Sequence, residues 1–429
     1  MRRRIWRALW VAGLLLGFSP AAWAQPAGPF GPGRPLPPYP LRSRAAPAPK
    51  QGGEAPRPRR TGSVAGVQLL APNVGWATNG PQLMWTSSGG TEWEDITPPG
   101  PKDGWISGIF FLDTNRGWVL FAHGEPDIPG GLQFDLASTD NAGASWSMRH
   151  VTVPDRRYAG SDILHGGSLA FADSVHGWLG LGAGLSAASR GTGVLLATED
   201  GGETWKLATA TGWDTHDEIG PMLMLTPKQG WMVSGGANDE LLVTRDGGRT
   251  WQSIELESPV KTDLMRQYDR NLEQFERSIA GTKLASMQPP QHPSSYAAYR
   301  LPTFNDPKHG YVCVTYPGVV VLFATEDGGV TWKPDRVLTG LHDHEQDTTV
   351  VSAVADSTWF TGRVPKNGMP QLTKLGPGAS ATDTTMPAPE ESAVRRMSFA
   401  TVSQGWVVTN ESKLLATNDG GATWTDITP

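Results

Sequence analysis

Short apolar runs separated by turns repeat along the chain from about residue 64 onward. Runs such as Ile109-Phe110-Phe111 and Leu241-Leu242-Val243 have the length and composition of buried strands. The stretch from Asp263 to Ile279 departs from this pattern. Its apolar residues recur at helical spacing, at Leu264, Tyr268, Leu272, Phe275 and Ile279. The pattern predicts an all-β domain with one inserted helix.

An eight-residue motif recurs between these runs. Four copies read Thr-x-Asp-Gly-Gly-x-Thr-Trp and begin at Thr198, Thr244, Thr325 and Thr417, and two looser copies begin at Thr86 and Thr139, with Ser88 and Asn141 at the Asp position. An Asp side chain accepts backbone N–H bonds within its own turn, and paired glycines permit positive φ, so the motif predicts tight hairpin turns. The residues to which this assigns a structural role are Asp200, Asp246, Asp327, Asp419, Trp205, Trp251, Trp332 and Trp424.

A second signature, Gly followed by an aromatic residue, lies 17 to 28 residues before each motif Trp. It occurs at Gly75-Trp76, Gly117-Trp118, Gly177-Trp178, Gly230-Trp231, Gly310-Tyr311 and Gly405-Trp406. The two signatures and the apolar runs between them therefore predict four short strands in each unit. Eleven of the 18 Trp residues belong to the two signatures, which favours wedges between packed sheets over a ligand cage.

The spacing of the motif Trp residues predicts the number of units. Successive gaps are 53, 59, 46, 81 and 92 positions, and the last gap is twice 46. A degenerate unit over residues 349–385 fills that gap and raises the total to seven. The gap of 81 holds an insertion of about 35 residues that includes the predicted helix.

The two signatures, repeated through residues 64–429, resemble the seven-bladed propellers of the photosystem II assembly and stability factors. The same Asp box, or BNR-type repeat, also occurs in sialidases, sortilin-type receptors and xyloglucan-active hydrolases. The resemblance implies a seven-bladed β-propeller with four-stranded blades, one of them degenerate, and one helical insertion. It also implies a binding protein rather than an enzyme. The cyanobacterial factors typically carry a lipidated Cys, whereas the one cysteine here is Cys313, in an apolar run that predicts a buried free thiol.

The N-terminal region predicts export. Arg2, Arg3, Arg4 and Arg7 precede an apolar run over residues 8–18, and Ala22-Trp23-Ala24 supplies the small residues of a cleavage site. The run is shorter than the ~20 residues of a spanning helix. We expect a signal peptide over residues 1–24, a flexible Pro- and Arg-rich linker over 25–60, and the propeller over 61–429 with its helical insertion at about 258–300.

Charge is divided unevenly between linker and domain. Residues 1–60 hold 11 of the 36 Lys and Arg residues and one of the 42 Asp and Glu residues, which leaves 25 basic and 41 acidic groups, or −16, on residues 61–429. Such a field repels polyanions, so nucleic acid is not an expected partner of the domain.

Loop lengths predict where function lies. Loops joining strands one to two and three to four are short, whereas those on the other face are long and irregular, and sites are carried by loops on rigid scaffolds. The candidate binding residues on the long-loop face are Arg156, Arg157, Tyr158, His165, Trp213, His216, Arg300, His342, His344, Arg395 and Arg396. They are expected around the mouth of a central channel. The alternative is an ordinary polar surface.

Catalytic alternatives have weaker support. Tyr299-Arg300-Leu301-Pro302 is similar to the arginine signature of sialidases, but it follows the fourth motif copy instead of preceding the first, and Leu replaces the usual Ile. A xyloglucan hydrolase needs a cleft between two propellers, and the chain has length for one. His342 and His344 fall short of a zinc signature.

The sequence therefore predicts a periplasmic or secreted scaffold, monomeric and not membrane-spanning, that binds a protein or peptide through its long-loop face. No catalytic residues, cofactor or metal are assigned. The alternative function is a glycoside hydrolase of sialidase type.

Overall fold

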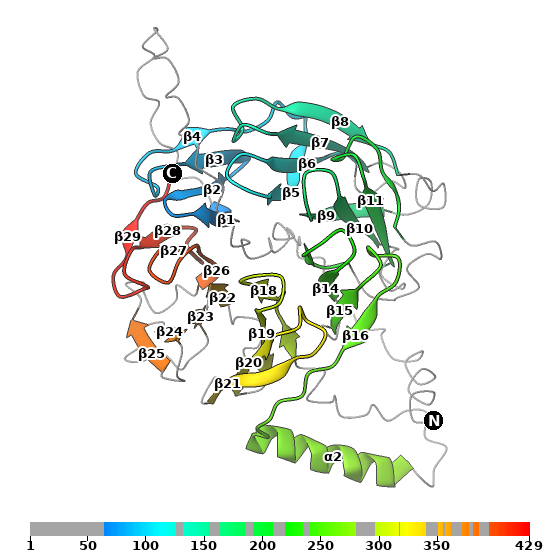
Figure 1. The fold of residues 1–429 in the computed structure, drawn as a ribbon, viewed down its shortest axis with the longest axis vertical. Coiled ribbons are helices and arrows are strands. Elements are labelled where there is room, and N and C mark those ends of the chain that lie inside the picture. The colour runs from blue at the N-terminus through cyan, green and yellow to red at the C-terminus, as the bar shows by residue number, and fades with distance from the viewer. Residues whose placement is uncertain are drawn as a thin grey trace.

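The computed structural model describes residues 64–125, 132–153, 163–184, 192–208, 219–234, 240–279, 297–316, 318–339, 351–354, 357–361, 371–376, 381–385 and 394–429. The expected signal peptide and linker lie outside these residues. The described strands form antiparallel sheets arranged in a ring, with the first sheet (blue) beside the last (red) in Figure 1. The fold is an all-β propeller of four-stranded antiparallel blades.

Among the described residues, six sheets have four strands and one has five. The first three sheets comprise β1 (Val64–Ala71), β2 (Val74–Asn79), β3 (Gln82–Thr86) and β4 (Glu94–Asp95); β5 (Trp105–Phe111), β6 (Gly117–Gly124), β7 (Leu132–Thr139) and β8 (Ser147–Val151); and β9 (Ile163–Phe171), β10 (Gly177–Gly184), β11 (Thr192–Thr198) and β12 (Lys206–Leu207). Each sheet uses consecutive strands, and its first strand is the innermost (Figure 1).

The next sheets contain β13 (Met222–Met224), β14 (Gly230–Ser234), β15 (Glu240–Thr244) and β16 (Gln252–Ile254), and then β17 (Ala298–Tyr299), β18 (Thr303–Phe304), β19 (Gly310–Tyr316), β20 (Val319–Thr325) and β21 (Lys333–Thr339). The last two contain β22 (Val351–Val354), β23 (Ser357–Phe360), β24 (Gln371–Leu375) and β25 (Ala381–Thr385), and then β26 (Val394–Phe399), β27 (Gly405–Thr409), β28 (Leu414–Thr417) and β29 (Thr425–Asp426). Strands β22 to β25 form a four-stranded sheet within residues 349–385.

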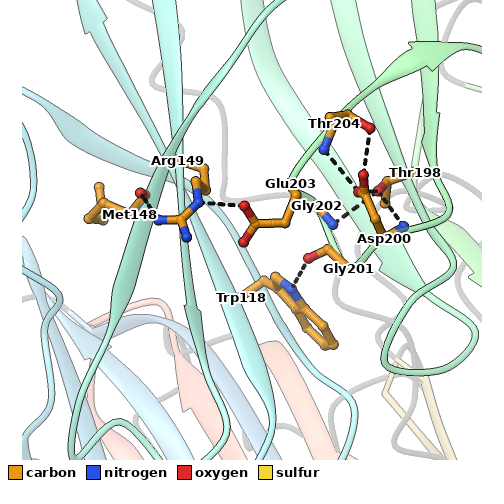
Figure 2. A network of polar contacts seen from close by, with 9 residues as sticks. All are labelled: Trp118, Met148, Arg149, Thr198, Asp200, Gly201, Gly202, Glu203 and Thr204. Carbon is orange, nitrogen blue, oxygen red and sulfur yellow. Dashed lines mark hydrogen bonds and ion pairs between the residues drawn. The ribbon is translucent and has the colours of Figure 1, made fainter.

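The Thr-x-Asp-Gly-Gly turns, which we call the Thr-Asp turns, are held by their own side chains. In the turn after β11, Asp200 accepts bonds from the Thr204 backbone N at 2.9 Å and from the Thr204 hydroxyl at 2.5 Å, while the Gly202 N donates to Thr198 Oγ1 at 3.0 Å (Figure 2). Burial raises the pKa of Asp200, but the opposing hydrogen bonds outweigh it and lower the pKa to about 2. The carboxylate therefore holds its own turn together through these hydrogen bonds.

The looser copies fold into the same turn. Asn141 Oδ1 accepts the Ser145 backbone N–H at 2.9 Å, and Ser88 Oγ accepts that of Glu92, also at 2.9 Å. Because a neutral oxygen fills the place of the carboxylate, the turn depends on an acceptor at this position rather than on charge.

Both short loops of a sheet lie on one face. The first glycine of a Thr-Asp turn donates its N–H to the loop between strands one and two, as in Gly201 to Val175 and Gly247 to Lys228, both 2.8 Å. This confirms the prediction that the two kinds of short loop share a face, which we call the turn face. The first strand of each sheet therefore begins on the opposite face.

Neighbouring sheets are joined by indole groups. Three second-strand Trp residues donate their ring N–H to the first glycine carbonyl of the next sheet's turn: Trp118 to Gly201 at 3.0 Å (Figure 2), Trp178 to Gly247 at 2.9 Å and Trp359 to Gly420 at 3.0 Å. Trp76 instead donates to Gln68 of its own sheet, and the buried Trp231 ring N–H has no partner among the described residues. Trp118 also stacks on Phe171 of the third sheet at 3.7 Å between ring centroids. The tryptophans are wedges between sheets, as predicted.

A different pair joins the fifth and sixth sheets. Tyr311 replaces the second-strand Trp, and the sixth sheet has no Thr-Asp turn. Arg336 of β21 is buried over the Tyr311 ring, 5.4 Å from its centroid, and donates to the carbonyls of Leu375 at 3.2 Å and Gly376 at 2.9 Å. The guanidinium thus occupies the role that an indole N–H has elsewhere.

The ring closes without strand exchange among the described residues. Trp93 of the first sheet donates to the Ile427 carbonyl at 2.9 Å and lies 5.7 Å from the Trp406 ring, and Asn79 donates to the Pro429 carbonyl at 3.3 Å. Side-chain packing and a few hydrogen bonds therefore replace the shared strand that would otherwise join the two ends.

The predicted helix is confirmed as α2 (Asp263–Ile279), which lies outside the ring in Figure 1. The side chains of its apolar positions are outside the described set. The segment that precedes the helix is held at buried Leu256. The backbone N–H of Leu256 donates to the Tyr299 hydroxyl, and its carbonyl accepts a hydrogen bond from the Tyr316 hydroxyl. Among the described helices, none is long and apolar enough to cross a membrane. Cys313 is a buried free thiol, as predicted, and burial raises its pKa to about 12.

Asp200→Ala should lower the free energy of unfolding by about 1 kcal/mol, because several turn N–H and hydroxyl donors lose their acceptor. Asp200→Asn should lose less, since Asn141 already serves in the same geometry. The folded pKa of Asp200 is depressed to about 2. The carboxylate's advantage is therefore complete above its unfolded pKa of about 3.9 and disappears as the pH falls through about 2. Urea unfolding of the three proteins at a series of pH values measures this, and a pH-independent gap between wild type and Asp200→Asn would contradict it.

Arg336→Met should lower the free energy of unfolding by about 2 kcal/mol, because two buried carbonyls lose their donor. Arg116→Met is the matched control, since Arg116 is exposed and pairs with Asp113 on the surface. Equal stability of the two variants in urea would show that Arg336 does not join the sheets.

Candidate functional site

Most predicted binding residues cannot be placed. Seven lie outside the described residues: Arg156, Arg157, Tyr158, Trp213, His216, His342 and His344. His165 lies in β9 opposite Gly182, and its side chain is not described. The geometry of the site is therefore built from Arg300, Arg395 and Arg396.

Arg395 and Arg396 lie at the start of β26, the innermost strand of the last sheet. Val394 pairs with Thr409 and Arg396 with Val408, so Arg395 is an extra residue, a β-bulge. Bulges interrupt the ladder and re-aim side chains. Arg395 is exposed and donates to Ser412 Oγ at 3.4 Å, whereas Arg396 is partly buried.

Arg300 lies within the innermost strand of the fifth sheet. Its backbone N donates to the Cys313 carbonyl at 3.1 Å, which extends the pairing of β17 with β19 by one residue. Leu301 and Pro302 then interrupt the strand before β18 resumes pairing with β19. The interruption gives this strand, too, one residue more than its partner.

The three arginines are electrostatically coupled. Burial lowers the pKa of Arg396, and the positive charges of Arg395 and Arg300 lower it further. Arg300 and Arg396 are 96 positions apart and belong to sheets that have another sheet between them in sequence. The charges of Arg395 and Arg300 thus act on Arg396 although Arg300 is distant from it in sequence.

The bulge at Arg395 has counterparts in other innermost strands. Ser107 is the extra residue in β5, between Ile106 and Gly108, and Gly166 is the extra residue in β9. Each bulge lies near the start of its strand, on the face opposite the turn face. We call the starts of the innermost strands β5, β17 and β26, with Trp105, Arg300, Arg395 and Arg396, the inner rim.

Trp105 is a rim residue that sequence analysis missed. It begins β5 and is 43% exposed, the one aromatic side chain among the exposed large hydrophobic residues of the described part. Trp105 belongs to neither Trp signature, and this departure from the repeat could have marked it as a candidate binding residue. Trp and Arg are the residue types that most often dominate binding energy at protein interfaces.

The rim can bind anions. Arginine carries a planar fork of donors that matches carboxylates, and a partly desolvated guanidinium binds them more strongly than one in bulk water. Tyr299, beside Arg300, is buried with its hydroxyl oxygen accepting the Leu256 N–H, and burial raises its pKa. That phenol is not poised as a nucleophile. Within the described residues, no group of three or more His, Cys, Asp and Glu side chains is placed to hold a metal ion.

Comparison with known proteins shows similarity at the level of the fold. No family profile matches the sequence, and no curated protein matches it. The solved structure of YCF48 bound to a D1 peptide is 15% identical, with a TM-score of 0.43, over 76% of this chain and 83% of that one. YCF48 from Cyanidioschyzon merolae is 14% identical, with a TM-score of 0.43, over 77% and 88%. A prolyl endopeptidase is 11% identical, with a TM-score of 0.49, over 85% of this chain and 49% of its own. These values carry no argument about function.

Arg396→Met removes a positive charge that faces those of Arg395 and Arg300, so it should change how stability depends on salt. Added NaCl should stabilise the wild type more than the variant, because salt screens the repulsion. Thermal unfolding of both proteins over a salt series measures this, with exposed Arg116→Met as the control. An equal salt dependence in wild type and Arg396→Met would contradict it.

Proposed function

We propose that the chain is a seven-bladed propeller that binds a protein or peptide partner at its inner rim and catalyses no reaction. Each described sheet is one blade in this proposal. The protein works after export, in the periplasm or outside the cell, as an assembly or stability factor for envelope proteins.

The convergence of Arg300, Arg395 and Arg396 is the observation that carries the proposal. Two innermost strands supply these residues, and burial together with the positive charges of Arg395 and Arg300 lowers the pKa of the partly buried Arg396. Groups whose pKa is shifted by burial and by neighbouring charges are often found at functional sites. The bulge at Arg395 and the interruption after Arg300 also occur where bulges commonly re-aim functional side chains.

The scaffold supports a binding role because its strong motifs are used for structure. The Thr-Asp turns, the indole bonds and the Tyr311–Arg336 pair all join strands or sheets. This leaves the face on which the innermost strands begin for binding, and a scaffold that is already ordered lowers the entropy lost on association.

Affinity capture from the native envelope tests the proposal. The rim variant Arg300→Gln, Arg395→Gln, Arg396→Gln is compared with wild type and with a turn-face control, Arg116→Gln, Arg245→Gln, Arg249→Gln, which removes the same charge from exposed positions. One defined partner should be retained by wild type and control and reduced at least about tenfold with the rim variant, the loss typical of binding hot spots.

Equal retention by all three proteins would contradict the proposal, and so would equal loss from both variants. The sialidase alternative is tested separately. Release of sugar from a sialoside by wild type, abolished by Arg300→Gln, would replace the binding function with a catalytic one.

A further inference from the structure

The fifth sheet turns polar side chains toward the sixth. Cys313 of β19 belongs to one buried cluster with Leu375 of the sixth sheet. Tyr311 and Thr315 lie two positions before and after Cys313, so their side chains project to the same side of the strand. Thr315 is buried, and its hydroxyl has no hydrogen-bond partner among the described residues. With Arg336, the fifth sheet therefore places a thiol, a hydroxyl, a phenol and a guanidinium at this boundary.

The sixth sheet is joined to the seventh by the contacts that are usual in this ring. Trp359 stacks on Phe399 at 4.0 Å between ring centroids, and its ring N–H donates to the Gly420 carbonyl at 3.0 Å. The Phe399 backbone N also donates to Ser352 Oγ at 3.0 Å. The second sheet is joined to the third by the same stacking and the same indole bond, so the sixth and seventh sheets pack as one unit.

Toward the fifth sheet, the sixth accepts hydrogen bonds from a buried charge instead. Arg336 donates to the carbonyls of Leu375 and Gly376 and pairs with Asp335 at 2.7 Å. The cost of removing a charge from water offsets much of what such bonds contribute. Separation of the two sheets would return Arg336 and the unpaired Thr315 hydroxyl to water, which recovers these costs. Opening is therefore less unfavourable here than at a boundary closed by stacked aromatic rings.

We infer that the ring opens reversibly between its fifth and sixth sheets, and that the sixth and seventh sheets move together while the other boundaries keep their contacts. This conformational device goes beyond the binding function and does not depend on it. The innermost strands β17 and β26 lie on opposite sides of the opening boundary, so their separation changes with it (Figure 1). A ligand that bridges these strands shifts the equilibrium toward the closed ring.

Cys313 reports on the opening. It is the one cysteine of the chain, and in the closed ring it is a buried thiol whose pKa burial raises to about 12. A thiol reagent therefore reacts with it only when the boundary opens or the whole domain unfolds. The matched control is Val314→Cys with Cys313→Ala. It moves the thiol by one position on β19 to a buried site in the cluster between the fourth and fifth sheets.

The experiment measures N-ethylmaleimide labelling by mass spectrometry, at urea concentrations below the unfolding transition. Each rate is compared with the rate that the same protein's global unfolding allows, which tryptophan fluorescence gives. Cys313 should react at least about tenfold faster than that limit. Its rate should depend only weakly on urea, because a local opening exposes less surface than unfolding does. The Val314→Cys control should follow its own global unfolding.

Arg336→Met should speed the labelling of Cys313 at least about tenfold at low urea, because the open state no longer competes with hydrogen bonds from a charged donor. Exposed Arg116→Met is the control and should label like wild type. The comparison of Cys313 with Val314→Cys remains decisive even if Arg336→Met does not fold.

Three results would overturn the inference. If Cys313 reacts only as fast as global unfolding allows, the boundary does not open by itself. If Cys313 and the Val314→Cys control both react faster than that limit with weak urea dependence, opening is not specific to the boundary with the sixth sheet. If a folded Arg336→Met protein labels like wild type, Arg336 does not hold the boundary closed. None of these results bears on rim-dependent capture of a partner, which tests the proposed function separately.

Discussion

The tryptophan wedged between neighbouring sheets is the contact on which the ring depends, and at three boundaries its indole N–H also donates to a glycine carbonyl of the next sheet. That hydrogen bond requires three things at once: a Trp on the second strand, a glycine carbonyl exposed by the turn, and a turn held firm by its Thr and Asp. A turn that loosens would move the carbonyl and leave a buried donor unpaired, which costs more than the bond contributes. Between the fifth and sixth sheets both the Trp and the Thr-Asp turn are absent. There Arg336, packed on Tyr311, donates the hydrogen bonds to the next sheet instead.

The repeats made the fold predictable and left the site mostly unpredictable. The helix from Asp263 to Ile279, the four strands of the degenerate unit and the role of Asp200 follow from local patterns that each unit repeats. The coupling of Arg300 to Arg396 follows from how the ring closes, and no local pattern encodes that. The bulge at Arg395 could not be predicted either. One extra residue in a short strand leaves too few positions on each side for the alternation of apolar and polar residues to reveal it. Trp105 was missed because the other tryptophans favoured a structural role for the whole class.

A division of labour between the two faces follows from this construction. The turn face is closed by bonds within and between turns, so many of its backbone groups are already paired. On the opposite face several innermost strands, including β5, β9 and β26, begin with a register shift, and there the structure has a partly buried Arg396 beside like charges and an exposed Trp105. Local departures from regular geometry and charge balance commonly mark functional positions, and here they cluster at one edge of the ring. The basic linker and the acidic domain place opposite charges on the two parts of one chain, with the boundary between them at this edge.

Hydrogen–deuterium exchange of the protein with and without its captured partner tests the central claim most directly. The account predicts slower exchange on binding at the start of β26, at Arg300 and at the start of β5, with no change at the turns around Asp200 and Asp246. Slower exchange confined to the Thr-Asp turns would place the partner on the turn face and contradict the account.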